Sequence, residues 1–261
     1  MYLQYDYQMR IRYSAPVEKC FYTIKCIPKT TMRQKATETI IQMSPQSDWS
    51  YGEDGWKNKT IYGNIQKAHD TFEFRVHGKV EIQPSKYEEK ADRYQVGMYC
   101  YPFGKCCPGD GLRQYFASAD LTGCGSALEK SIRIMHDLYR HFSYVSRQTE
   151  VSTSAEEAWH MGMGVCQDYA HIFIVLLRLA GIPARYVCGL LAGEGASHAW
   201  VEAFCEGRWI GLDPTNDCCI GDSHIKLCDG RDASECAINR GIIIGGGSQH
   251  QDVCAVVKQI I

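Results

Sequence analysis

The sequence predicts an α+β protein, in which an antiparallel β region precedes a region of helices and further strands. Two changes of periodicity indicate this class. Roughly the first 85 residues alternate apolar and polar positions, and from Ser126 the apolar spacing becomes helical. Strand-like runs return after the last predicted helix, which favours helices packed on a sheet over regularly alternating strands and helices.

The amino-terminal region is expected to form strands with one buried face. Aromatic and branched residues alternate with polar ones over residues 3–13 and again over 72–82. Further strands are expected at 20–27 and 37–43. Residues 44–58 are interpreted as a loop, because they carry Pro, Gly, Asp and Asn. We therefore expect a small antiparallel β-sandwich here.

Residues 84–125 are a transition without a predicted helix or strand, because Pro and Gly recur through them and interrupt each apolar pattern. We place a domain boundary within this transition. Residues 1–110 are then a β-sandwich domain with its linker, and residues 111–261 are a second domain.

Three helices are predicted in the second domain. Apolar residues between 128 and 142 follow helical spacing, and Ser154 followed by Glu157 is a capping-box pattern. The third pattern, at 170–180, is apolar nearly all round, so this helix should be buried. Gly181 is expected to end it.

Strand-like runs follow at 184–191, 199–204, 208–212 and 253–261. Glu206 and Gly207 are the expected turn of a hairpin between the second and third runs. A hairpin centred on this turn pairs Trp200 with Asp213 and makes His198 a diagonal neighbour of Asp213 on the same face. A register shift of one residue would place His198 and Asp213 on opposite faces.

Cys166 is the candidate nucleophile. It lies where the buried helix begins, and a thiol at a helix N-terminus faces the positive end of the helix dipole, which favours the thiolate. A nucleophile also needs a base and a group that orients the base. His198 and Asp213 fit these roles, although the spacing alone does not place Cys166 beside them. The structural alternatives are a packed thiol, a hydrogen-bonded histidine and a turn-forming aspartate.

The composition is that of an ordinary globular protein. Of 261 residues, 45% are hydrophobic and 22% charged, and 28 basic against 30 acidic residues leave a net charge of −2. This balance gives no electrostatic reason to expect nucleic acid or an acidic membrane as a partner. There is no apolar run of about 18 residues, so no transmembrane helix is predicted.

The 14 cysteines are expected to be reduced thiols. We see no signal-peptide pattern at the N-terminus and therefore expect a cytoplasmic protein. The cysteines form no Cys-x-x-Cys pair, and adjacent doublets such as Cys106-Cys107 are poor geometry for one tetrahedral zinc ion. We accordingly predict no metal and no cofactor.

Four motifs, taken in order, resemble the bacterial transglutaminase-like superfamily. They are Gly164-Val-Cys-Gln-Asp-Tyr-Ala-His171, Gly181-Ile-Pro-Ala-Arg-Tyr-Val187, Ser197-His-Ala-Trp-Val-Glu202 and Leu212-Asp-Pro-Thr-Asn216. The tail extends the resemblance with His224-Ile225, Gly230-Arg-Asp232 and Gly245-Gly-Gly247, whereas Ala233 and Ala237 depart from the usual pattern. The β region resembles the domain that precedes this core in many bacterial members.

The resemblance implies a papain-like transglutaminase core with a Cys-His-Asp triad. Carried over by motif, Cys166 is the nucleophile, His198 the general base and acid, and Asp213 the residue that orients His198. The backbone N–H of Cys166 and one further donor would bind the oxyanion. Candidates for that donor are Tyr144, Trp159 and Gln167; Trp200 either shields the triad from water or is plain core.

Other matched residues have structural alternatives. Asp168 is expected to cap the helix, and His171 to be a hydrogen-bonded core histidine. Arg185 and Glu202 form either a supporting ion pair or two solvated charges. The remaining matched residues either line the cleft or lock the tail over the core, and we favour the structural role for them. They are Asn216, His224, Arg231 and Asp232.

These inferences favour a cysteine protease or amidase, which cleaves a peptide, isopeptide or other amide bond through a thioester. One alternative is a protein-glutamine transglutaminase, in which an amine replaces water. Another is a catalytically silent module that binds peptides. The expected partner in each case is a peptide or protein.

Overall fold

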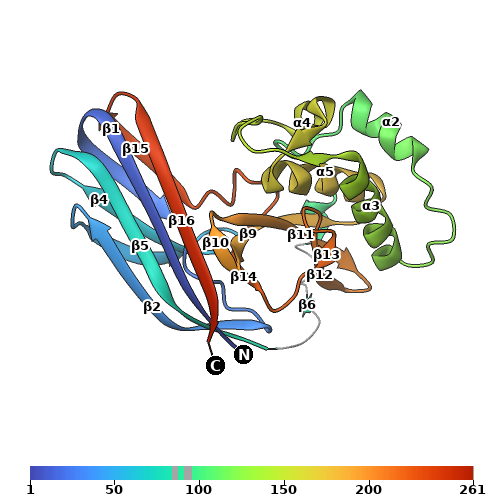
Figure 1. Ribbon diagram of the computed structural model, residues 1–261, viewed down its shortest axis with the longest axis horizontal. Coiled ribbons are helices and arrows are strands. Elements are labelled where there is room, and N and C mark those ends of the chain that lie inside the picture. Colours follow the sequence, from blue (N-terminus) through green and yellow to red (C-terminus); the bar gives the residue numbers. More distant parts are fainter. Residues whose placement is uncertain (84–87, 91–95, 261) are drawn as a thin grey trace.

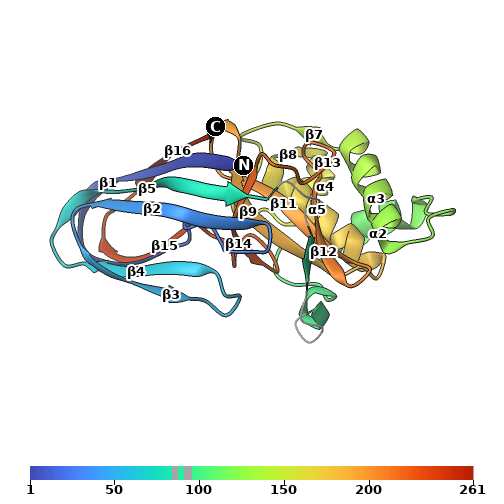
Figure 2. The same ribbon diagram turned by 90° about the horizontal axis from the view of Figure 1, so that it is seen from below.

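The computed structural model describes residues 1–83, 88–90 and 96–260. Figure 1 shows two large sheets, with the helices on one side of the second sheet, and Figure 2 shows the same arrangement from below. Both sheets are antiparallel, as predicted. No helix in this part of the chain is long and apolar enough to cross a membrane.

The first sheet is built around one long strand. Its described strands are β1 (Tyr2–Ile24), β2 (Gln34–Ser44), β3 (Asp48–Glu53), β4 (Lys59–Ile65), β5 (His69–Ile82), β10 (Gly193–Gly195), β15 (Asn239–Gly245) and β16 (Gln249–Ile260). The first half of β1 pairs with β5 and β16, and its second half pairs with β4 and β15. Every second residue over 3–11 and 72–82 is buried, which confirms the predicted alternation. A two-layered sandwich stays a prediction.

The prediction of a loop at 44–58 is wrong for its middle. Residues there form β3, in which Trp49 lies opposite Gly63 and Tyr51 lies opposite Ile61 of β4. Strand formation depends on the partner strand as well as on composition. The pairing with β4 therefore outweighs the turn-forming residues that indicated a loop.

The second sheet carries the candidate site. Its described strands are β6 (Glu88–Lys90), β9 (Ala184–Leu191), β11 (His198–Cys205), β12 (Arg208–Asp213), β13 (Cys218–Cys219) and β14 (His224–Gly230). Their order is β13-β12-β11-β9-β14, and β6 pairs with β12. The hairpin turn has positive φ at Glu206 and Gly207, as a two-residue turn of this kind requires. Val201 lies opposite Leu212, so the predicted register is confirmed.

The three predicted helices are present. They are α3 (Ala127–His141), α4 (Ala155–Met161) and α5 (Cys166–Leu179), and α5 packs against β9 and β11. Capping boxes begin α3 at Ser126 and α4 at Ser154. Nearly all of α5 is buried, as its all-round apolar pattern predicted.

One helix, α2 (Asp110–Ser118), was not predicted. Its first turn is capped by the Glu156 carboxylate of α4, which accepts hydrogen bonds from the N–H groups of Gly109, Gly111 and Leu112. A cap supplied from a distant helix leaves no local sequence signal. The remaining short elements are the 3-10 helix η1 (Gly97–Tyr99) and the parallel pair β7 (Ser143–Tyr144) and β8 (Met163–Gly164).

Strand pairing crosses the domain boundary predicted at residues 110 and 111. The last strands, β15 and β16, return to the first sheet and pair with β1, whereas β6 from the first part joins the second sheet. A division at this point therefore does not separate the two sheets, because pairing brings together strands that are far apart in the chain.

Candidate active site

Cys166 is the first residue of α5 and follows the short strand β8. The turn before it is held by Asp168, whose Oδ2 accepts hydrogen bonds from the Val165 N–H at 2.8 Å and the Thr149 hydroxyl at 2.6 Å. This confirms the expected capping role of Asp168. Burial raises the pKa of Asp168, and the two hydrogen bonds partly oppose that effect.

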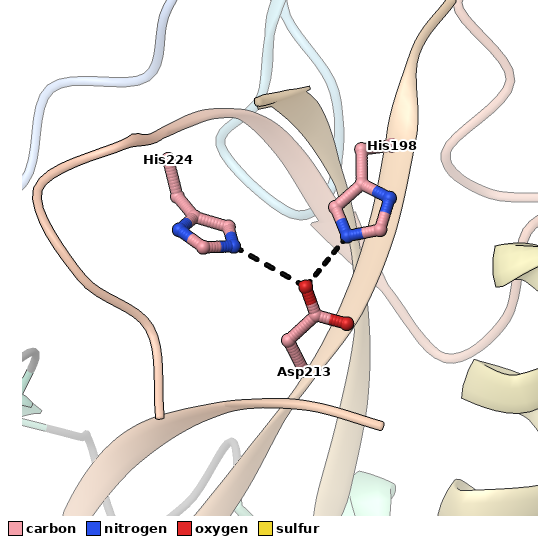
Figure 3. Close-up of side chains that lie close together, drawn as sticks. All are labelled: His198, Asp213 and His224. Carbon is pink, nitrogen blue, oxygen red and sulfur yellow. Dashed lines mark hydrogen bonds and ion pairs between the residues drawn. The ribbon is translucent and has the colours of Figure 1, made fainter. Parts of the chain in front are cut away.

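His198 and Asp213 lie together at adjacent strand ends. His198 begins β11 and Asp213 ends β12, and their Nε2 and Oδ2 atoms are 2.7 Å apart (Figure 3). The Asp213 side chain is fully buried, and that of His198 is 12% exposed. The hairpin register thus produces the contact that the sequence predicted.

The charges of these groups are coupled. Burial alone would lower the pKa of His198, but hydrogen bonds to Asp213 and Cys166 and attraction to their charges raise it to about 10. Burial alone would raise the pKa of Asp213, yet hydrogen bonds with His198 and His224 hold it well below its ordinary value. Because His198 Nε2 faces Asp213, the other ring nitrogen is the one available to the Cys166 sulfur. The structure therefore brings the three candidate residues together.

Two further side chains bind the Asp213 carboxylate. The Asn216 amide donates to Oδ2 at 2.7 Å, and His224 Nε2 lies 3.3 Å from the same oxygen. The backbone N–H groups of Thr215 and Asn216 donate to Oδ1. Our sequence interpretation favoured a structural role for Asn216 and His224 and missed this contact. An Asp-Pro-Thr-Asn turn is a usable signal for Asn216, because Asp commonly accepts from the next backbone N–H groups.

Trp200 packs against both histidines. Its ring is completely buried, 6.3 Å from the His198 ring and edge-on to the His224 ring at 5.4 Å between centroids. Gly189 makes room for it, since a Cβ atom there would come within 2.3 Å of the indole. Trp200 is thus a core residue, and its ring forms the apolar surface against which His198 and His224 pack.

The other candidates for oxyanion binding lie in different surroundings. Tyr144 is 56% exposed and lies opposite Gly164, directly before the Cys166 turn. Burial raises its pKa, and the charge of Cys166 adds to that effect. Gln167 is partly exposed at the start of α5. Trp159 instead stacks on Tyr115 of α2, with ring centroids 4.4 Å apart.

His171 is a buried core histidine, as expected. Its Nε2 accepts a hydrogen bond from the Ala233 N–H at 3.1 Å, while its Nδ1 has no partner among the described residues. Burial lowers the pKa of His171 to about 3. The ring is therefore neutral at ordinary pH.

Arg185 and Glu202 form an ion pair and not two solvated charges. Arg185 Nε lies 2.6 Å from Glu202, and the Lys226 ammonium lies 2.8 Å from Glu202 and 2.9 Å from Asp229. Lys29 reaches Asp229 at 2.5 Å. Burial would raise the pKa of Asp229, but Arg185, Lys226 and Lys29 hold it far below its ordinary value.

Two matched tail residues have the structural role that we favoured. Arg231 pairs with Glu235 and stacks over the Phe103 ring at 3.4 Å. Asp232 accepts a hydrogen bond from the Lys105 N–H at 3.1 Å. Both contacts fasten the tail to the segment before α2.

The donor atoms of His198, Asp213 and His224 lie within 4.8 Å of one another, which is close enough to consider a metal ion. However, Nε2 of His198 and Nε2 of His224 already face the same Asp213 oxygen at hydrogen-bond distance. An ion would also have to displace the proton that the raised pKa of His198 indicates. Hydrogen bonding therefore accounts for this cluster better than metal binding.

Two family models match the chain. The model of the transglutaminase-like superfamily matches residues 116–214, and that of the bacterial transglutaminase-like N-terminal region matches residues 3–81.

Individual proteins show the same likeness. The uncharacterized protein ML0607 of Mycobacterium leprae is 39% identical over 127 residues, which are 45% of this chain and only 45% of that relative's own length. A protein-glutamine gamma-glutamyltransferase of Pseudomonas aeruginosa is 40% identical over 65 residues, 20% of this chain and 10% of that protein.

Among solved structures, a candidate cysteine protease from Cytophaga hutchinsonii matches with a TM-score of 0.79 and 20% identity. The match covers 100% of this chain and 92% of that one, so the two proteins share a fold over both sheets.

Proposed function

The chain belongs to the bacterial transglutaminase-like superfamily, and from this premise we propose that it is a cysteine-dependent hydrolase that cleaves a peptide, isopeptide or other amide bond. One observation carries the proposal: His198 contacts the Asp213 carboxylate at 2.7 Å and also hydrogen-bonds the Cys166 side chain. A thiol, a base and a group that orients the base are the arrangement that nucleophilic catalysis requires.

In the proposed reaction the Cys166 thiolate attacks the amide carbonyl carbon and forms a carbon–sulfur bond. His198 then gives its proton to the leaving amine as the carbon–nitrogen bond breaks, which leaves a thioester. Water attacks the thioester while His198 accepts its proton. The products are a carboxylate and the regenerated Cys166 thiolate paired with the protonated His198.

The oxyanion that forms during attack needs hydrogen-bond donors. The first N–H groups of a helix have no partner within the helix, so the backbone of Cys166 at the start of α5 supplies one. We propose the Tyr144 hydroxyl as the second donor. It belongs to the strand beside the Cys166 turn, whereas Trp159 is occupied by stacking on Tyr115.

Transfer to an amine is the second candidate activity. The short match to a Pseudomonas aeruginosa protein-glutamine gamma-glutamyltransferase favours it, because such an enzyme would form the same thioester. A glutamine-containing protein substrate incubated with a fluorescent primary amine distinguishes the two activities. Stable incorporation of the amine indicates transfer, and release of ammonia or a new free carboxylate without incorporation indicates hydrolysis.

The direct test measures alkylation of each cysteine by peptide mapping, in wild type and in His198→Ala. The proposal expects fast labelling of Cys166 that slows markedly in the variant, because the imidazole would no longer support the thiolate. Equal labelling in the two proteins contradicts it. A Cys166→Ala protein that binds peptides as well as a wild type without turnover would instead support the silent binding module.

A cytoplasmic location and a peptide or protein partner are parts of this proposal. The 14 cysteines are all free thiols, which suits a reducing compartment.

A further inference from the structure

Two imidazole rings share one oxygen of the buried Asp213 carboxylate. His198 Nε2 approaches Oδ2 at 2.7 Å, and His224 Nε2 approaches the same atom at 3.3 Å from the other side (Figure 3). His224 begins β14, which pairs with β9 and is separated from β12 by the two strands β11 and β9. A triad needs only the first of these rings, so the second calls for an explanation.

Both ring nitrogens of His224 have polar partners. Its Nε2 faces a carboxylate and must carry a hydrogen, while its Nδ1 lies 3.1 Å from the Ser223 hydroxyl, which can donate to it. The side chain is only 4% exposed, and Trp200 holds the ring edge-on. His224 therefore offers Asp213 a hydrogen-bond donor in a fixed orientation.

We propose that His224 is a positioning residue, which holds the Asp213 carboxylate in place and limits how strongly that carboxylate binds the proton of His198. A carboxylate that already accepts other hydrogen bonds is a weaker partner for one more donor. This role rests on the proposed function, in which His198 must give its proton to the leaving amine. A proton held too tightly would slow that step.

Groups from four elements act on His198, and the proposal must be separated from each. Asp213 of β12 and Cys166 of α5 raise its pKa, and His224 approaches from β14. Cys218 of β13 lies opposite Asp213, but burial raises its pKa to about 11, so it is uncharged at neutral pH. Replacing Cys166 by alanine removes the other group that raises the pKa of His198 and leaves Asp213 as the group that His224 modifies.

The experiment is a titration of the His198 ring by NMR in protein labelled with ¹⁵N-histidine, in a Cys166→Ala background. It compares His224→Leu, which lacks the donor, with His224→Gln, whose amide keeps a donor near the Nε2 position. We expect His224→Leu to raise the titration midpoint of His198 by about one pH unit, and His224→Gln to stay within a few tenths of the parent. An unchanged or lowered midpoint in His224→Leu, or equal shifts in both variants, overturns the proposal.

His171→Leu is the matched control, because it removes an equally buried histidine that binds a backbone N–H instead of Asp213. It should leave the His198 midpoint unchanged. If His224→Leu does not fold, as judged by its thermal unfolding, the comparison of His224→Gln with His224→Asn replaces it. The shorter asparagine amide does not reach Asp213, so its midpoint should rise as described for leucine.

Failure of the proposed function gives a different result. An equal rate of Cys166 alkylation in wild type and in His198→Ala would contradict the hydrolase mechanism. The NMR titration midpoints of His198 would still report whether His224 modifies Asp213. If the mechanism holds, His224→Leu should lower kcat about tenfold with little change in KM, and His224→Gln should restore most of it.

Discussion

Two buried polar clusters lie on the same strands of the second sheet and differ in how their charges are arranged. The active-site cluster joins His198 of β11 and His224 of β14 to Asp213. The ion-pair cluster joins Glu202 of β11 and Lys226 of β14 to the residues Lys29, Arg185 and Asp229. Trp200 is the residue of β11 midway between His198 and Glu202.

In the active-site cluster several donors converge on one acceptor, and one of them, His198, also reaches the thiol. In the ion-pair cluster each acid contacts two or more bases, so the charges compensate one another. The first arrangement suits the proton transfer that the proposed mechanism requires. The second arrangement pairs each acid with bases, and we infer that it joins the two sheets.

Residues from the first part of the chain bind the backbone of β14 in the second sheet. Gln34 exchanges two hydrogen bonds with the backbone of Lys226, and the Asn58 amide donates to the Asp229 carbonyl at 2.8 Å. Together with Lys29, these residues come from the first part of the chain. The ion-pair cluster therefore joins the two sheets.

The largest expected effect is on turnover. Cys166→Ala removes the proposed nucleophile and should lower kcat at least about 10³-fold, since residues that act as one catalytic unit lose nearly all rate together. Cys166 is only partly buried, so the free energy of unfolding should change by less than about 1 kcal/mol. Turnover and denaturant unfolding of the same preparation check both parts. Residual turnover near the wild-type level would separate Cys166 from the chemistry.

Glu202→Gln should produce the opposite pattern, with a large loss of stability. It leaves Arg185 and Lys226 buried beside a neutral amide, and removing one partner of a buried pair costs about 3–5 kcal/mol. Glu38→Gln is the matched control, because its pair with Lys79 is about half exposed and should cost under about 1 kcal/mol. Similar losses in the two variants, measured by denaturant unfolding, would contradict the distinction between the clusters.

Lys29→Met tests the attachment itself. Asp229 keeps Lys226 and Arg185, so we expect a smaller loss of about 2 kcal/mol, typical of a hydrogen bond to a charged group. Limited proteolysis should cut the variant faster than wild type in the segments between the two sheets. An unchanged cleavage pattern would show that Lys29 is not needed to hold them together.

Local patterns predicted a large part of this arrangement. The capping residue Ser154 and the turn at Glu206 and Gly207 act within a few residues of themselves, so the start of α4 and the hairpin register follow from the sequence. The register in turn places His198 and Asp213 on one face.

The missed features depend on contacts between distant segments. His224 reaches Asp213 from another strand, and Glu156 caps a helix more than 40 residues earlier in the chain. Lys29 and Asp229 are 200 residues apart. No periodicity or spacing reports which of several charged residues a folded sheet will bring together, so such contacts emerge only from the tertiary structure.

The smallest expected effect comes from a comparison of His198 with His171, a buried histidine whose Nε2 binds a backbone N–H. Burial lowers the pKa of His171 to about 3, whereas Asp213 and Cys166 raise the pKa of His198 to about 10. Between pH 6.5 and 4.5 the unfolded chain therefore binds a proton at residue 171 that the native chain does not, and stability should fall as the pH falls. His198 acts in the opposite sense, because its contribution is present below about pH 6.5 and is lost as the pH rises toward 10.

His171→Leu should accordingly flatten the acid side of the curve of unfolding free energy against pH by roughly 1 kcal/mol per unit, although it lowers stability at every pH. His198→Leu should flatten the alkaline side. An unchanged acid slope in His171→Leu would mean that burial does not keep this ring neutral, and the contrast between His198, which binds a carboxylate, and His171, which binds a backbone N–H, would fail.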